Sequence, residues 1–264
     1  MLKLTEITFL HLIMIILCYL IALLVIPGKV ALAGKSGDDS PIHLFIVGDS
    51  TACNYERDRA PRAGWGQMFQ QYFNDKVVVV NEAASGRSSK SFIDEKRLEK
   101  VLSQIHAGDY LFIQFGHNDS KDEEARYTEP YTTYKAFLTM YIEGAREKGA
   151  IPVLLTPINR RKFGADGKLH LTHGEYPQAM IQLGEELNVP IIDITAKSQV
   201  YFEKLGAEET KKVFLWLKPG EHPNYPNGIE DDTHLCETGA SQIAKLVVEG
   251  IKEANLALVE YVKE

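Results

Sequence analysis

The chain has 264 residues, a length that fits one large domain or two small ones, and 45% of its residues are hydrophobic while 25% are charged. This composition excludes a disordered chain and predicts a packed core. The formal net charge is -7 and no long basic run is present, so nonspecific attraction to a phosphate backbone is excluded and nucleic acid is not an expected partner.

The N-terminal segment carries an apolar run of 20 residues, Ile7 to Ile26. A run of this length is sufficient to span a bilayer, so residues 7–26 are a candidate membrane anchor. The small-x-small site Ala31-Leu32-Ala33, followed by the polar stretch 34–41, favours instead a cleaved signal peptide over residues 1–33 and a linker over 34–41. Cleavage removes two lysines and one glutamate and takes the formal charge from -7 to -8. We therefore expect an acidic protein that is exported, secreted or periplasmic, with no stable membrane partner.

From residue 42 onward, short β-rich runs alternate with longer stretches of helical spacing, which is typical of an α/β fold. The strand candidates are nearly continuous in apolar residues, as in a parallel sheet buried on both faces. In chain order the predicted elements are strand Ile42 to Val47, helix Gly64 to Phe73, strand Val77 to Asn81, helix Ile93 to Ile105, strand Tyr110 to Phe115, helix Tyr131 to Lys148, strand Ile151 to Thr156, helix Tyr176 to Leu187, strand Pro190 to Ile194 and helix Glu237 to Glu264. The pattern predicts a doubly wound domain with a five-stranded parallel sheet over residues 42–264.

Three connections are longer than the usual two to six residues or so: Ser120 to Pro130, Pro157 to Gly174 and Lys218 to Thr233. In open α/β sheets, ligands bind outside the carboxyl ends of the strands. We expect these connections to surround a functional site.

Four polar blocks are predicted to reach that end of the sheet. Gly48-Asp49-Ser50-Thr51-Ala52 follows the first strand, Asn81 to Ser88 closes the second, and Gly116-His117-Asn118-Asp119 follows the third. Near the C-terminus, Asp231 lies three residues before His234, a spacing that lets the carboxylate contact the imidazole. Each block alone also fits an ordinary turn or cap. Their arrival at one face favours a functional site.

The four blocks, in this order, resemble those of the SGNH or GDSL hydrolase superfamily, from Ile42 to the C-terminal helix. More narrowly, GDSTA, AASGRSSKSF, FGHND and DDTHLCETGA are similar to bacterial rhamnogalacturonan acetylesterases, carbohydrate esterases that remove acetyl groups from pectin. The resemblance implies a three-layer α/β/α, flavodoxin-like fold and a reaction without metal or cofactor.

The resemblance also implies residue roles: Ser50 as nucleophile, His234 as general base and Asp231 as the carboxylate that orients it. Asp232 is a rival to Asp231 that the sequence alone leaves open. The oxyanion hole would consist of the backbone N–H groups of Ser50 and Gly86 and the side-chain amide of Asn118.

Other features limit the alternatives. Ala52 breaks the G-x-S-x-G elbow of the α/β-hydrolase fold, and Ser50 follows the first strand, too early for that fold. His117 and Asp119 are expected to hydrogen-bond loop backbone. The eight histidines form no compact metal motif, and His170 and His173 are interpreted as substrate-loop or surface residues.

The expected substrate is an acetylated polysaccharide or oligosaccharide, most specifically acetylated rhamnogalacturonan. A lipid or thioester acyl hydrolase with the same triad, and a noncatalytic carbohydrate- or nucleotide-binding protein, are the alternatives. Because the protein is acidic, local cations must recognise an anionic polymer. The candidates are Arg87, with Lys90, and Arg160 to Lys162, which includes Arg161; Arg87 has the alternative of anchoring its own loop.

Two cysteines, Cys53 and Cys236, remain after the predicted cleavage. Cys53 lies three residues after Ser50 and Cys236 two residues after His234, so an assembled triad brings both into one neighbourhood. In an exported protein they are expected either to form a disulfide or to stay as two small thiols.

Overall fold

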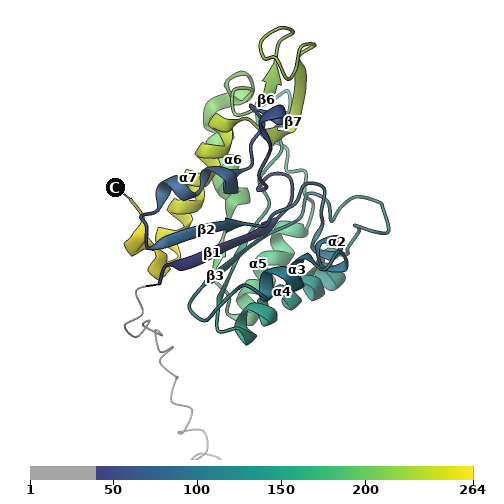
Figure 1. The fold of residues 1–264 in the computed structure, drawn as a ribbon. Coiled ribbons are helices and arrows are strands. Elements are labelled where there is room, and N and C mark those ends of the chain that lie inside the picture. The colour runs from purple at the N-terminus through teal and green to yellow at the C-terminus, as the bar shows by residue number, and fades with distance from the viewer. Residues whose placement is uncertain (1–39, 264) are drawn as a thin grey trace, which may run out of the picture. The chain divides into compact units, whose positions relative to one another are not determined.

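The computed structural model describes residues 40–263 (Figure 1). The predicted signal peptide or anchor, and the linker up to residue 39, lie outside the described residues. No helix within residues 40–263 is long and apolar enough to cross a membrane.

Five parallel strands form the central sheet, in the order β2-β1-β3-β4-β5. This confirms the predicted sheet. Their bounds are β1 Ile42–Gly48, β2 Val77–Asn81, β3 Tyr110–Gln114, β4 Ile151–Leu155 and β5 Ile191–Ile192. The chain moves from β1 outward to β2 and then back across β1 to β3, so the carboxyl ends of β1, β2 and β3 lie side by side. Three of the four polar blocks therefore leave the sheet at neighbouring points.

Alternate residues of β1 enter two different cores, because successive side chains of a strand point to opposite faces. Leu44 and Ile46 pack with helix α7 (Glu237–Glu253), whereas Phe45 and Val47 pack with α4 (Lys135–Glu147). The helices α2 (Ser89–Asp94), α3 (Arg97–Leu102), α4 and α5 (Tyr176–Leu187) cover one face, and α6 (Ile194–Thr210) and α7 cover the other (Figure 1). The three layers are those expected.

The predicted helix Gly64 to Phe73 is wrong in type. Its buried aromatic residues Trp65, Phe69 and Phe73 repeat with helical spacing, but the backbone forms two short 3₁₀ turns, η2 (Trp65–Met68) and η3 (Gln70–Tyr72). The side chain of Gln70 donates to the carbonyl of Val77 at 3.0 Å and accepts from the N–H of Val79 at 2.8 Å. These bonds occupy the open edge of β2, so the segment follows the sheet edge.

Two other predicted helices differ at their ends. The predicted helix Ile93 to Ile105 begins earlier, at Ser89, where Ser88 and Ser91 form a reciprocal capping box, and it breaks at Lys96, whose φ is +58°. The C-terminal helix ends at Glu253 and a short 3₁₀ turn, η5 (Ala257–Tyr261), follows Asn255, whose φ is +51°. The helix predicted at Tyr131 to Lys148 begins with a π turn, η4 (Pro130–Tyr134), and continues as α4. Helix α5 has the predicted bounds.

Helix α6 was not predicted, and the fifth predicted strand extends too far. Asp193, placed in that strand from the sequence, is the N-cap of α6, and its carboxylate accepts from the N–H of Ala196 at 3.0 Å. The last strand therefore shortens to two residues, because the chain turns into a helix at the cap.

A second, two-stranded antiparallel sheet contains β6 (Phe214–Leu217) and β7 (Ile229–Leu235). The sequence predicted an irregular connection from Lys218 to Thr233, but its last residues belong to β7. This hairpin extends beyond the main sheet, at the top of Figure 1. It carries the fourth polar block.

Candidate active site

Ser50 lies in a tight turn directly after β1. The carboxylate of Asp49 accepts from the N–H and the hydroxyl of Thr51, both at 2.8 Å, and the carbonyl of Asp49 accepts from the N–H groups of Ala52 and Cys53. Burial raises the pKa of Asp49. The carbonyl of Ser50 accepts from the hydroxyl of Tyr55 at 2.7 Å. Ser50 is 7% exposed, so its hydroxyl is held in one place with limited access to water.

His234 lies in an interruption of the β6–β7 ladder. Phe214 pairs with Leu235, whereas Leu215 pairs with Asp231, so the three residues from Asp232 to His234 have no paired residue on β6. Within this bulge the carboxylate of Asp231 accepts from the N–H groups of Thr233 at 2.8 Å and of His234 at 2.9 Å. The bulge directs the His234 side chain toward the Asp231 carboxylate.

The three predicted residues form one continuous line of hydrogen bonds. Nε2 of His234 lies 3.0 Å from Oγ of Ser50, and Nδ1 of His234 lies 2.7 Å from Oδ2 of Asp231. The Asp231 carboxylate fixes the tautomer with the proton on Nδ1, which leaves Nε2 to accept from the serine hydroxyl. Burial alone would raise the pKa of Asp231, but the hydrogen bond and charge of His234, with the two backbone donors, lower this pKa to about 2.

Backbone pairing sets the distance between serine and histidine. Residues 61–63 run antiparallel to residues 235–237: the N–H of Ala63 donates to Leu235 at 3.1 Å, and the N–H of Glu237 donates to Pro61 at 2.8 Å. The N–H of Trp65 in turn donates to the carbonyl of Thr51 at 2.9 Å. The hairpin is thus joined through one short segment to the turn that carries Ser50.

The rival carboxylate, Asp232, faces away from the imidazole. Its Oδ1 accepts from Nη1 of Arg161 at 2.9 Å and from Nε1 of Trp216 at 2.8 Å, and its carbonyl accepts from the N–H of Arg161 at 2.8 Å. Arg161 also donates twice to the carbonyl of Ala207 and lies 4.8 Å from the centre of the Trp216 ring. Asp231 is therefore the partner of His234, and Asp232 binds the bulge to Arg161 and Trp216.

The predicted oxyanion residues lie beside Ser50 on the neighbouring strands. Gly86 follows β2 and has φ of +82°, a conformation that residues with a side chain rarely adopt, although an added Cβ would meet no atom within 4 Å. Asn118 follows β3 and is 4% exposed; its Nδ2 donates to the carbonyl of Arg87 at 3.0 Å. Within the described residues, no hydrogen bond occupies the backbone N–H of Ser50 or of Gly86.

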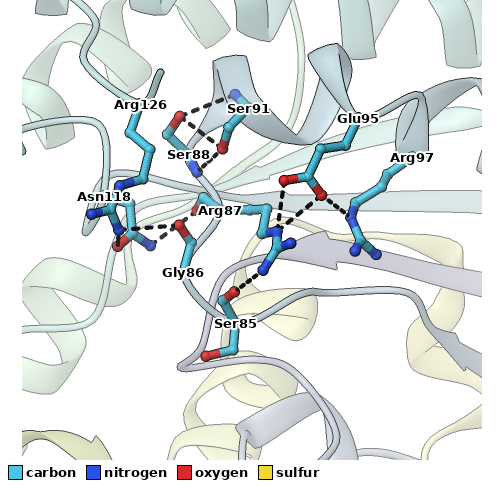
Figure 2. Close-up of polar contacts among 9 residues, drawn as sticks. All are labelled: Ser85, Gly86, Arg87, Ser88, Ser91, Glu95, Arg97, Asn118 and Arg126. Atoms are coloured by element: carbon cyan, nitrogen blue, oxygen red, sulfur yellow. Dashed lines mark hydrogen bonds and ion pairs between the residues drawn. The ribbon is translucent and has the colours of Figure 1, made fainter. Parts of the chain in front are cut away.

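The cations predicted to contact substrate are largely engaged within the protein. Arg87 donates from Nε to both oxygens of Glu95 at 3.0 Å and from Nη1 to the carbonyl of Ser85 at 2.7 Å (Figure 2), so it anchors its own loop. Lys90 donates to the carbonyl of Glu124 at 2.6 Å.

The two arginines after β4 are engaged as well. Arg160 donates to the carbonyl of His117 at 3.1 Å and, at 3.4 Å, to Thr172, and burial lowers its pKa. The side chain of Arg161 is only 11% exposed. The guanidinium groups of Arg87 and Arg161 are each bound to a carboxylate and to a backbone carbonyl, and contact of either with substrate stays a prediction.

Arg126 was missed from the sequence. It lies in the connection 120–130, and its Nη1 is 3.4 Å from the carbonyl oxygen of Gly86 and 3.4 Å from Oδ1 of Asn118 (Figure 2). No local pattern marks it, since it is one charge in the mixed run Lys121 to Arg126. Its position depends on a loop conformation that periodicity does not encode.

Two histidines near the site form a buried pair. Nε2 of His173 lies 3.1 Å from Nδ1 of His117, and the two rings meet edge to face. Burial and the neighbouring His173 lower the pKa of His117 well below its usual range, and burial with nearby Arg160 lowers that of His173 to about 3. Both rings are therefore neutral. Of the two alternatives predicted for His173, a surface position is wrong because the residue is buried, and the substrate-loop alternative stays a prediction; His170 is exposed.

Asp119 connects three segments, the start of α2, its own turn and the connection 120–130, where the hydroxyl of Thr128 donates to its carboxylate at 3.3 Å. Its carboxylate accepts from the N–H and hydroxyl of Ser89 and from the N–H of Gly116 at 3.0 Å. Burial raises the pKa of Asp119 to about 7, despite these donors. The carboxylate joins the start of α2 to the Asn118 turn.

The two cysteines are thiols, which rules out the disulfide alternative in this structure. Cys53 lies beneath the serine turn with its Sγ 3.8 Å from the carbonyl oxygen of Ser50. Cys236 donates instead to the carbonyl of Lys212 at 3.1 Å, next to β6. Each thiol belongs to a different local contact. In residues 40–263, no three His, Cys, Asp or Glu side chains lie together in a way that could hold a metal ion.

Known proteins are similar to this chain over most of its length. The model of the GDSL-like lipase/acylhydrolase family matches residues 46–226. The rhamnogalacturonan acetylesterase RhgT of Bacillus subtilis is 51% identical over 221 residues, covering 84% of this chain and 94% of RhgT. The probable rhamnogalacturonan acetylesterase YesY of the same organism is 44% identical over 219 residues, covering 83% and 96%. The crystal structure of YxiM from Bacillus subtilis has a TM-score of 0.71 at 29% identity, covering 83% of this chain and 58% of YxiM.

The lowered pKa of Asp231 predicts a pH dependence of stability. A carboxyl whose pKa is about 2 in the folded state, against about 3.9 in the unfolded state, stabilises the fold above the unfolded value. That stabilisation is lost as the pH falls through the folded value. In urea unfolding from about pH 6 to pH 3, the free energy of unfolding should fall more steeply for the wild type than for Asp231→Asn. An Asp75→Asn control, at an exposed position, should keep the wild-type slope; equal slopes for all three proteins would contradict the prediction.

Proposed function

Because this chain belongs to the GDSL-like lipase/acylhydrolase family, we propose that it is a serine esterase that removes acetyl groups from rhamnogalacturonan, the acetylated backbone polysaccharide of pectin. The observation that carries the proposal is the line of hydrogen bonds from Ser50 through His234 to Asp231, in a chain that is 51% identical to RhgT. The relatives RhgT and YesY do not favour the lipid or thioester alternative.

The proposed reaction begins with attack of Ser50 Oγ on the acetyl carbonyl carbon. His234 Nε2, 3.0 Å from Oγ, takes the serine proton, and the Asp231 carboxylate stabilises the resulting imidazolium. The tetrahedral intermediate collapses by breaking the bond to the sugar oxygen, which takes the proton from His234. Water then attacks the acetyl-serine and gives a proton to His234. As the bond between the acetyl carbon and Oγ breaks, His234 returns this proton to Oγ, which restores Ser50 and releases acetate.

The negative charge that develops on the carbonyl oxygen needs donors that are already in place. The backbone N–H groups of Ser50 and Gly86 and the Asn118 amide supply three, from the ends of β1, β2 and β3. One N–H of the Asn118 amide is bound to Arg87, and the second remains for the oxyanion. These donors belong to three adjacent strand ends, so the sheet itself maintains their spacing.

The triad assignment predicts a graded loss of activity. Ser50→Ala and His234→Ala should each lower kcat for a small acetyl ester by about 10⁴-fold or more, whereas Asn118→Ala should cost about 10² to 10³-fold. The matched control is Ser103→Ala on the exposed end of α3, which should behave as wild type. Acetate release from acetylated rhamnogalacturonan should exceed that from acetylated xylan. Turnover by Ser50→Ala, or a preference for xylan, would refute the mechanism or the substrate, respectively.

The contacts of Arg161 predict that it supports the site instead of selecting the polymer. Arg161→Ala should lower kcat roughly 10- to 100-fold, because it frees the bulge that carries His234, and the loss should be the same for a small neutral ester and for acetylated pectin. Lys211→Ala is the control, since Lys211 lies over the same Trp216 ring at 4.8 Å without contacting Asp232. A rise in KM confined to pectin would instead identify Arg161 as a substrate contact.

We also propose that the protein is exported. The apolar run 7–26 and the site Ala31-Leu32-Ala33 support this proposal. Expression of the full chain in a secreting bacterium should give an extracellular or periplasmic protein whose intact mass corresponds to a first residue at Gly34. An uncut chain in the membrane fraction would favour the anchor.

A further inference from the structure

The amide of Asn118 has to present nitrogen, and not oxygen, to a developing oxyanion. An amide side chain can turn about its last bond, which exchanges an acceptor for a donor. Two neighbours decide the orientation here. The carbonyl of Arg87 lies 3.0 Å from Nδ2, and the guanidinium of Arg126 lies 3.4 Å from Oδ1.

The turned orientation would bring two unfavourable contacts. Oδ1 would face the Arg87 carbonyl, acceptor against acceptor, and Nδ2 would face the guanidinium, donor against cation. Only the guanidinium contributes a charge, and Asn118 is 4% exposed, so water screens this interaction weakly. Arg126 is therefore the neighbour that most strongly penalises the wrong orientation.

The same Nη1 atom also donates to the carbonyl of Gly86 at 3.4 Å (Figure 2). Gly86 and Asn118 lie on different connections, after β2 and after β3. One guanidinium nitrogen thus joins two of the three proposed oxyanion elements. One of them is a glycine, Gly86, whose backbone is less restricted than that of other residues because it has no Cβ.

Arg126 is itself fixed. Its Nε donates to Glu123 at 2.9 Å, its Nη2 contacts the other oxygen of Glu123, and its side chain is 21% exposed. The connection that carries it is tied down on both sides, because Lys90 donates to the carbonyl of Glu124 and the N–H of Thr128 donates to the carbonyl of Asp119. The cation is a fixed part of the site.

We propose that Arg126 is a positioning residue that fixes the orientation of the Asn118 amide and strengthens it as a donor to the oxyanion. This role rests on the proposed function. A cationic donor on Oδ1 polarises the amide, so that the remaining N–H on Nδ2 is a stronger donor. Arg126 need not touch the substrate, and its effect is expected in the transition state, where the oxyanion exists.

Arg126→Ala should lower kcat for a small neutral acetyl ester about 10- to 100-fold, less than the loss from removing the donor itself, with KM nearly unchanged. Affinity for a boronic acid that forms a tetrahedral anion on Ser50 should fall in parallel. Guanidinium chloride at millimolar concentration should restore part of the activity, and potassium chloride at equal ionic strength should not. The kcat of Arg126→Lys should lie between those of the alanine variant and the wild type, because lysine keeps a positive charge near Oδ1 but lacks the planar guanidinium group.

Arg97→Ala is the matched control, because Arg97 also pairs with a glutamate, Glu95, but contacts neither Gly86 nor Asn118 (Figure 2). It should keep wild-type kcat and show no guanidinium rescue. Thermal unfolding separates these effects from a loss of fold, and if Arg126→Ala does not fold, the lysine variant gives the same comparison.

A double-mutant cycle provides the sharpest test. If Arg126 acts through Asn118, then Arg126→Ala should change kcat by less than about 3-fold in the Asn118→Ala background. An undiminished effect in that background, a change in KM alone, or wild-type kcat in Arg126→Ala would overturn the assignment. These outcomes leave the proposed function standing as long as Ser50→Ala is inactive, whereas an active Ser50→Ala variant would refute the proposed function itself.

Discussion

The antiparallel pairing of residues 61–63 with residues 235–237 is the contact on which the site depends. Ser50 and His234 are 184 residues apart in sequence; Ser50 follows a strand of the main sheet, whereas His234 lies in the two-stranded sheet. Backbone hydrogen bonds join the hairpin to the segment that crosses behind the serine turn. At Gly64 an added Cβ would lie 2.2 Å from the carbonyl oxygen of Cys53, so only glycine allows this segment to approach the serine turn this closely. The 3.0 Å distance between imidazole and hydroxyl is therefore set by the main chain.

The sheet could be predicted because its physical cause is local. Each strand of the sheet is a nearly continuous apolar run, and such a run is typical of a strand that is covered by helices on both faces of a parallel sheet. The helices were predicted less well where tertiary contacts outweigh local spacing. Trp65, Phe69 and Phe73 have helical spacing, but the edge of β2 takes up the side chain of Gln70 and the backbone forms 3₁₀ turns. Aspartate is a common N-cap residue, but Asp193 was assigned to a strand from the sequence because it lies within an apolar run.

The site residues divide in the same way. Ser50, Asn118 and the Asp231–His234 pair were found because they directly follow predicted strands or lie close together in sequence. The choice between Asp231 and Asp232 needed the bulge, since the two residues differ only in which side of the strand they occupy. The contacts of Arg87, Arg126 and Arg161 join segments 8 to 71 residues apart. No rule of sequence spacing identifies these three among the 29 lysines and arginines of the chain. These guanidinium groups hold loops together by donating to carbonyls and carboxylates of the protein.

The separate two-stranded sheet makes different contacts near its base and at its tip. Acid and base lie within four residues of β7, Asp231 to His234, while the serine lies in the turn that follows a strand of the main sheet. The tip of the hairpin, between Leu217 and Ile229, is covalently close to this pair but takes no part in its hydrogen bonds. The tip bonds instead to the segment that precedes residues 61–63: Asn224 donates to the carbonyls of Arg57 and Ala60, and Tyr225 donates to the carbonyl of Arg59. The hairpin thus carries the Asp231–His234 pair near its base and a separate set of contacts at its tip.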